Sequence, residues 1–168
     1  MGSATATGVT TTQVYEIYIK ATPDAIWHAI TAPDWTERYG YKGAIEMELR
    51  PGGSYRALAN PGMKAMGMPD VVIDGVVEES DPPRRLVHTY RFLFSDVMKD
   101  EGFTRLTWEI EQVSDSCRLT VTHDQLRDGA CEELVVERLA GEHARLRLAS
   151  EGDGELGRSA RRSRELGC

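Results

Sequence analysis

Hydrophobic and polar residues alternate in three successive segments, Leu86–Phe94, Thr104–Gln112 and Cys117–Asp124. A period of two is typical of a β-strand with one face in water and the other face covered. Successive strands of this kind predict an antiparallel sheet with one buried face. Because rings with polar atoms are frequent on the covered face, this face is typical of a cavity lining. The covered positions are Leu86, His88, Tyr90 and Phe92, then Leu106, Trp108 and Ile110, then Leu119, Val121 and His123.

Two short helices are expected after a first strand at Gln13–Lys20. Thr22 can cap the first helix and Pro23 suits its first helical position, while Pro33 is expected to stop it. We expect Asp34 to cap a second short helix that runs through Trp35–Tyr39.

Three more strands and two connecting loops complete the predicted sheet. Gly75 inside one strand suggests a bulge or a bend. Two connecting segments, Asn60–Asp70 and Phe94–Gly102, are rich in turn-forming residues and are expected to be loops. The first of these loops holds Met63, Met66 and Met68, whose flexible side chains could adapt to a ligand or simply fill the space. The expected strands are Ala44–Leu49, Ser54–Ala59 after the turn Pro51–Gly53, and Val71–Glu78.

The end of the chain has a different pattern. Glu132–Ser150 carries apolar residues at roughly helical spacing, which predicts one long helix. Gly152–Cys168 is rich in Gly, Arg and Glu and is expected to be disordered, as is a flexible leader over residues 1–12. We therefore expect a single α+β domain over residues 13–151, in which a curved antiparallel sheet wraps around the C-terminal helix and leaves space beside it.

Composition limits the function classes. The chain has 168 residues and a net charge of -7, which argues against a general nucleic-acid surface. No apolar run approaches the roughly 20 residues of a membrane span, and no signal peptide is visible. The cysteines Cys117, Cys131 and Cys168 form no close pair and no zinc-binding spacing, which fits a cytoplasmic protein. Cys117 and Cys131 are expected to be free buried thiols.

Four segments in the same order carry a resemblance to a known family: Ile19–Thr31, Pro51–Tyr55, Gly75–Val87 and Thr104–Leu126. Over residues 13–126 the chain resembles the START-like, helix-grip superfamily, whose fold is shared with the birch-pollen allergen. Within it, the chain is most similar to bacterial homologues of the C-terminal domain of the heat-shock-protein-90 ATPase activator. It departs from the family pattern at its end, where the expected helix lacks the tryptophan with which members usually begin it.

The resemblance implies a cavity between sheet and helix for a small hydrophobic or amphipathic ligand, and no single reaction. Superfamily members include binders, transporters and a few cyclases, so the function depends on the site. We expect ligand binding without efficient catalysis, no cofactor and no metal. The candidate ligand-binding residues are Trp35, Tyr39, Tyr55, Met66, His88, Tyr90, Trp108 and His123.

The two histidines leave alternatives open. His88 and His123 could bind a ligand or act as acid or base, as in a cyclase or hydratase with Tyr90, or they could be satisfied core residues. No triad is expected, because Glu109 and Asp124 have the opposite parity. A third possibility is an interaction module that docks on a chaperone or another protein. That function needs an apolar outer face, whereas the pattern places Arg, Thr and Glu there.

Overall fold

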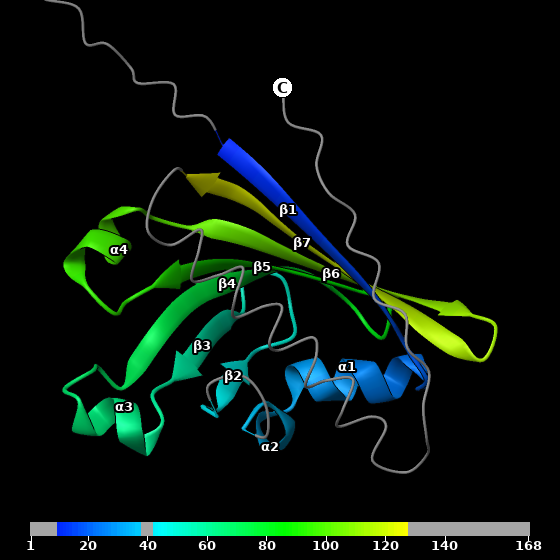
Figure 1. The fold of residues 1–168 in the computed structure, drawn as a ribbon, viewed down its shortest axis with the longest axis horizontal. Helices are drawn as coiled ribbons and strands as arrows, with labels where there is room; N and C mark the ends of the chain where they lie inside the picture. Colours follow the sequence, from blue (N-terminus) through cyan, green and yellow to red (C-terminus); the bar gives the residue numbers. More distant parts are fainter. Residues whose placement is uncertain (1–9, 38–41, 128–168) are drawn as a thin grey trace, which may run out of the picture.

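Seven strands form one curved antiparallel sheet in the computed structural model, which describes residues 10–37 and 42–127 (Figure 1). The strand order is β1-β7-β6-β5-β4-β3-β2, so that each strand from β2 to β7 lies beside its neighbour in sequence. Strand β1 pairs with β7, so the first and last strands of the described chain are neighbours in the sheet. The strands are β1 (Thr10–Ile19), β2 (Ile45–Met47), β3 (Ser54–Leu58), β4 (Val71–Asp81), β5 (Arg85–Phe92), β6 (Thr104–Val113) and β7 (Ser116–Arg127).

The alternation of the sequence is confirmed in the central strands, except that Val87 and Thr107 have the outer parity and are also buried. Trp108 faces Leu86 on β5 and Val121 on β7, and these three residues form one row across the sheet. Trp108 is only 9% exposed, whereas its neighbour Glu109 is exposed. The concave face of the sheet is therefore the buried one, and it carries the residues of the predicted parity.

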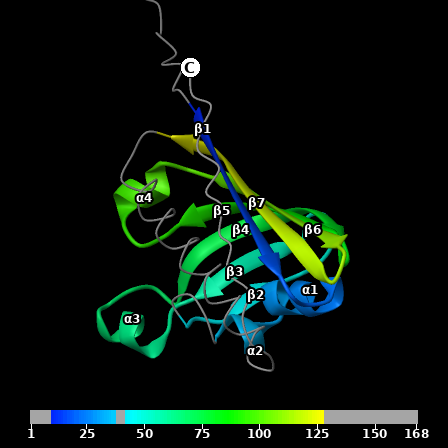
Figure 2. The same ribbon diagram turned by 45° about the vertical axis from the view of Figure 1, so that its right-hand side comes forward.

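Helix α1 (Pro23–Thr31) covers one end of the concave face (Figures 1 and 2). The Thr22 hydroxyl caps it by accepting a hydrogen bond from the Ala25 N–H at 3.2 Å, as expected. Its apolar side, which includes Ile26 and Trp27, joins the sheet's core. This helix therefore packs against the buried face at that end of the sheet.

The second helix differs from the prediction in its start. Helix α2 spans Pro33–Thr36, and its N-cap is Ala32, without a side-chain cap. Pro33 therefore begins this helix, because proline lacks only an N–H that the first turn leaves unpaired anyway. Asp34 lies in the first turn, where its charge favours the helix dipole. The expected end of this helix at Tyr39 lies outside the described residues.

Two segments that were expected to be loops contain short helices, α3 (Pro61–Ala65) and α4 (Asp96–Asp100), which lie at the end of the sheet away from α1 (Figure 1). Each is capped by a side chain. Asn60 accepts from the Met63 N–H at 2.9 Å, and Ser95 accepts from the Met98 N–H at 3.3 Å. The loop prediction was wrong here, because a single helical turn has too few residues to show a helical period.

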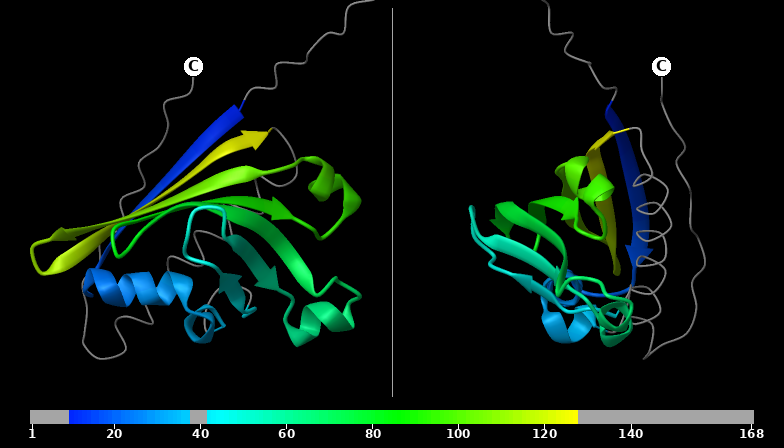
Figure 3. Two further views of the ribbon diagram at one scale, coloured as in Figure 1. Left: turned by 180° about the vertical axis from the view of Figure 1, so that it is seen from behind. Right: turned by 90° about the vertical axis from the view of Figure 1, so that its left-hand side faces the viewer.

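Strand β4 bends where its backbone approaches β5. A Cβ atom placed on Gly75 would lie 2.0 Å from the Thr89 carbonyl oxygen, so only glycine fits there. The register shift, however, lies between Val77 and Glu79 and not at Gly75 as expected. The close approach at Gly75 and the bulge after Val77 increase the local bend. Figure 3 shows the resulting arch from behind and from the side.

The outer face of the sheet is polar, as the alternation predicts. Ion pairs run across it, among them Arg105–Asp124 at 2.9 Å and Arg91–Asp74 at 2.7 Å. A hollow of about 410 Å³ lies on this face, and Arg105, Thr107 and Asp124 are among its lining residues. Residues 10–12 of the predicted leader belong to strand β1, so the leader prediction was wrong there. The rest of the leader, the C-terminal helix over 132–150 and the predicted tail lie outside the described residues.

Candidate functional site

A row of aromatic and imidazole rings crosses the concave face from β3 to β7. Tyr55 stacks on His88 with their ring centroids 4.2 Å apart and an interplanar angle of 24°. Tyr90 follows, 6.4 Å from His88, and His123 lies 6.0 Å beyond Tyr90 in an edge-on arrangement. All four are buried, as is Trp108. The structure thus brings together five of the residues that the sequence singled out.

Tyr55 and His88 stack across the strand that lies between them. Tyr55 on β3 and His88 on β5 are separated by strand β4, and the residue of β4 directly opposite Tyr55 is Gly75. Glycine has no side chain, so β4 places none opposite Tyr55 on this face of the sheet.

His88 is held as a neutral ring by two hydrogen bonds. The Trp108 indole N–H donates to His88 Nε2 at 3.2 Å, and an indole nitrogen can only donate. His88 Nε2 is therefore unprotonated, and Nδ1 carries the proton and donates to the Thr89 carbonyl at 3.0 Å. Burial lowers the pKa of His88 from 6.5 to about 4, against a smaller opposing effect of the Thr89 bond. Both ring nitrogens are occupied.

His123 has one nitrogen bonded and the other unpartnered. Its Nε2 lies 2.6 Å from the Thr104 hydroxyl, and that hydroxyl donates to the Tyr90 carbonyl at 3.1 Å. Both bonds form together only if Nε2–H donates to Thr104. Nδ1 is then a lone-pair acceptor. It is buried, and none of the described residues forms a hydrogen bond with it.

The electrostatic setting of His123 also favours the neutral ring. Burial lowers its pKa from 6.5 to about 4, and the nearby His88 adds to this shift. The Asp124 carboxylate opposes the shift, but it lies on the outer face, where Arg105 binds it. His123 is therefore uncharged at neutral pH.

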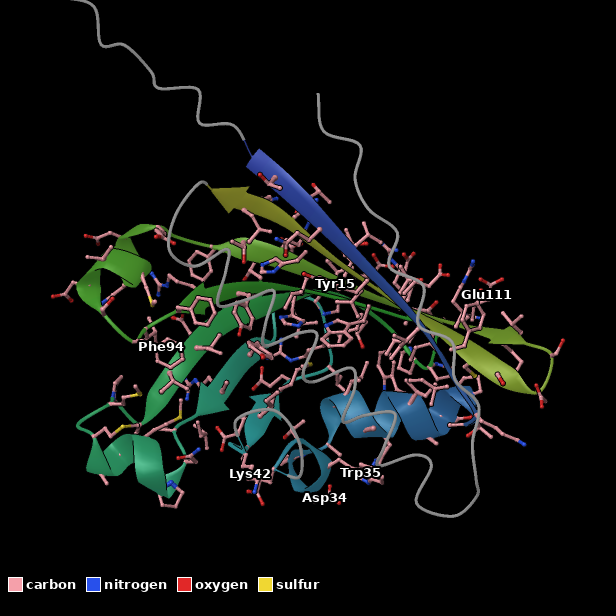
Figure 4. All side chains as sticks on the ribbon, in the orientation of Figure 1. Tyr15, Asp34, Trp35, Lys42, Phe94 and Glu111 are labelled. Carbon is pink, nitrogen blue, oxygen red and sulfur yellow. The ribbon has the colours of Figure 1, made fainter. Side chains whose placement is uncertain are left out.

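The other predicted site residues lie elsewhere. Trp35 is partly buried and packs against the core from α2, and Figure 4 shows it below the arch of the sheet. Met66 is 72% exposed at the end of α3, so it does not line the concave face as expected. The other two methionines of this segment, Met63 in α3 and Met68 just after it, pack against the core instead. Tyr39 lies outside the described residues.

Three residues that the sequence pattern did not single out also belong to this face: Thr104, Gln13 and Tyr15. Gln13 on β1 is opposite His123 on β7, and the Tyr15 hydroxyl donates to Gln13 Oε1 at 2.9 Å. Figure 4 shows Tyr15 near the middle of the arch. Their strand parity was a usable signal, since Thr104 shares it with Leu106 and Gln13 shares it with Ile17.

Three further features limit the possible functions. Within residues 10–37 and 42–127, His, Cys, Asp and Glu side chains form no group of three that could hold a metal ion. Over the same ranges, no helix has the length and the apolar character that a bilayer span requires. Cys117 is a free, buried thiol, and burial raises its pKa.

Solved structures share this architecture at low sequence identity. A protein from Rhizobium leguminosarum matches with a TM-score of 0.70 and 17% identity, covering 88% of this chain and 98% of its own. The Aha1 dimer from Colwellia psychrerythraea matches with a TM-score of 0.65 and 18% identity, covering 86% of this chain and 99% of its own. CalU16 from Micromonospora echinospora matches with a TM-score of 0.60 and 19% identity, covering 86% of this chain and 76% of its own. These likenesses show the fold alone.

Comparison with curated proteins finds no match. The model of one protein family, however, matches residues 20–149, which is most of the chain and includes all of the strands from β2 to β7. That family is described as activator of Hsp90 ATPase homolog 1-like protein. The START-like resemblance and the curved antiparallel sheet agree with this match, and the chain belongs to the activator of Hsp90 ATPase homolog 1-like family.

Proposed function

We propose that the protein binds a small, largely apolar molecule on the concave face of its sheet. The observation that supports this function best is the ring row from Tyr55 to His123. Flat rings with few polar atoms are the usual lining of small-molecule sites. In this proposal the ligand lies against the ring row on the concave face, the side of the sheet on which the family resemblance implies a cavity.

The two ends of the concave face differ in a way that supports a binding role. At the end beside α1, the inward residues are aliphatic or small, such as Ile19, Ile110 and Leu119. Cys117 also lies here and hydrogen-bonds the Ala21 carbonyl just before α1. The rings and their hydrogen bonds gather farther along the strands. A core that served only stability would gain little from this polar end, because each buried polar atom must be satisfied.

An acid–base enzyme of the cyclase or hydratase kind is less well supported. His88 would need a free nitrogen to move a proton, and both of its nitrogens hold hydrogen bonds. His123 has one free nitrogen, but no carboxylate of the described residues shares its face to orient it. Binding without efficient catalysis accounts for both histidines.

A chaperone-docking function is also less well supported. The family description names a chaperone activator, and an apolar outer face would suit such a partner. The outer face instead carries paired charges such as Arg91–Asp74 and Arg105–Asp124. We regard a protein partner as secondary to the ligand. We also propose a cytoplasmic location, in keeping with the free thiol of Cys117.

The test uses 2-methoxynaphthalene, a flat and largely apolar probe, titrated into the full-length protein by isothermal titration calorimetry. We expect saturable binding. Tyr15→Ala, on the concave face, should weaken it by about 2- to 13-fold, the worth of one aromatic contact. Tyr18→Ala is the matched control, because Tyr18 lies on the same strand but is 49% exposed on the outer face.

Circular dichroism spectra of both variants check that the fold is intact. An absence of saturable binding to folded protein, or an equal loss in the two tyrosine variants, would contradict the proposed function. Independently of the probe, mass spectrometry of molecules that co-purify with the protein would identify the natural ligand class directly.

A further inference from the structure

We propose that the ligand carries a hydroxyl or another hydrogen-bond donor, and that His123 Nδ1 accepts its proton in a hydrogen bond. This inference rests on the proposed function and names the chemical class of its ligand. The starting observation is that a buried ring nitrogen has no partner among the described residues. Buried polar atoms are rarely left unpaired in folded proteins, so an unpaired one indicates a missing partner.

The hydrogen bonds around Thr104 fix which kind of partner is missing. The Thr104 hydroxyl gives its proton to the Tyr90 carbonyl and receives one from His123 Nε2. If His123 carried its proton on Nδ1 instead, Thr104 would have to donate to Nε2 and would lose its bond to Tyr90. The arrangement with both bonds leaves a lone pair on Nδ1, which only a donor can satisfy.

The position of His123 shows from which side the donor comes. The ring stands edge-on to Tyr90 on the concave face, with an angle of 72° between the two planes. The side chain of the next residue, Asp124, points to the other face of the sheet and binds Arg105 there. The partner of Nδ1 therefore comes from the concave side, where the ring row provides an apolar surface for the rest of the ligand.

The same geometry disfavours an anionic head group. A carboxylate offers only lone pairs, which would face the lone pair of Nδ1. Adding a proton to His123 would give a charged ring, and burial opposes that charge. We therefore expect an alcohol or a phenol to bind better than the carboxylate of the same skeleton.

His88 provides an internal comparison. It lies on the same face and is just as buried, but its two nitrogens bond to Trp108 and Thr89. Nothing is left for a ligand to satisfy. The preference for a donor thus belongs to His123 and to Thr104, which acts as a positioning residue by fixing the proton on Nε2.

The experiment compares three ligands of one skeleton with the full-length protein at pH 7: 2-naphthol, 2-methoxynaphthalene and 2-naphthoate. Only 2-naphthol donates a hydrogen bond. We expect 2-naphthol to bind about 2- to 13-fold more tightly than 2-methoxynaphthalene, which is the range of one net hydrogen bond. The carboxylate should bind most weakly. In His123→Phe and in Thr104→Val the preference for 2-naphthol should disappear, whereas Tyr18→Ala should keep it.

Nitrogen-15 NMR of the histidine ring gives a readout that does not depend on any variant. In the ligand-free protein, His123 should carry its proton on Nε2, with Nδ1 unprotonated and free of a hydrogen bond. Addition of 2-naphthol should shift the Nδ1 signal, and addition of 2-methoxynaphthalene should not. In Thr104→Val the proton should be shared between the two nitrogens.

Each contrary result has a distinct meaning. Equal binding of 2-naphthol and 2-methoxynaphthalene overturns this inference and leaves the proposed function standing. An Nδ1 that is protonated or already hydrogen-bonded in the ligand-free protein also overturns it, because that atom would then need no donor from the ligand. If neither probe binds to folded protein, the proposed function fails and the inference fails with it.

Discussion

Lowering the pH from 7 to 5 should destabilise the protein strongly, because His88 and His123 are both buried as neutral rings. Burial lowers the pKa of each from 6.5 to about 4. In the unfolded chain both rings return to ordinary values and take up protons as the pH falls below 6.5. The unfolded state then binds more protons than the folded state. Stability is therefore fully present above pH 6.5 and is lost as the pH falls toward 4.

The size of the effect follows from these values. Between pH 7 and pH 5, one histidine that titrates at 6.5 when unfolded and at about 4 when folded removes about 2 kcal/mol of stability. Two such residues remove about 4 kcal/mol, a large part of the roughly 5–15 kcal/mol typical of a domain. Most carboxyl groups titrate below this range, so the histidines dominate it.

The assay is urea unfolding followed by circular dichroism at half-unit steps from pH 7 to pH 5. His123→Phe should reduce the pH dependence by about half, since one of the two buried rings is gone. His28→Ala is the control, because the His28 side chain is 59% exposed, and this variant should keep the full dependence. A loss of less than about 1 kcal/mol in the unsubstituted protein, or equal effects of the two substitutions, would refute the reasoning.

Two further predictions test the sheet. Trp108→Ala should cost about 3–5 kcal/mol of unfolding free energy in urea, whereas the exposed Glu109→Ala should be nearly neutral, and similar costs would contradict the register. Gly75→Ala should cost about 3 kcal/mol, because its Cβ would meet the Thr89 carbonyl oxygen at 2.0 Å. In the control Gly52→Ala, the added Cβ meets no atom within 4 Å, so this variant should cost only about 1 kcal/mol, because a side chain at φ +79° is strained. Equal losses of melting temperature in the two glycine variants would refute the close approach at Gly75.

Much of the sheet could be predicted from the sequence, because strand parity is a local property. The alternation around Trp108 allowed only one register, since a slip by one residue would have buried several charged groups. The cap of α1 at Thr22 could be predicted for a similar reason, because it needs only a few neighbouring residues. The helices α3 and α4 could not, since the signals that specify them, Asn60 and Ser95 as caps, are equally common in loops.

The site could be predicted in its members but not in its hydrogen bonds. Parity placed His88 and His123 on the same face. Parity could not show that Trp108 donates a hydrogen bond to His88, or that His123 bonds to Thr104 through Nε2 and keeps Nδ1 unpaired. These contacts depend on ångström-scale positions across strands. Met66 was misplaced because sequence proximity within a loop does not determine which side chain turns inward, and one turn of α3 directs it to solvent.

The position of β1 at the edge of the sheet has a consequence for folding and local opening. The strands from β2 to β7 follow one another in space as in sequence, so each can pair with its neighbour through a short connection. Strand β1 instead pairs with β7, and the contact between Ala21 and Cys117 joins residues 96 positions apart. Closing so long a loop is entropically costly before other contacts form, so β1 is expected to join the sheet late. The amides of β1 should then exchange with solvent sooner than those of β6, and Gln13 leaves the side of His123 whenever that edge opens.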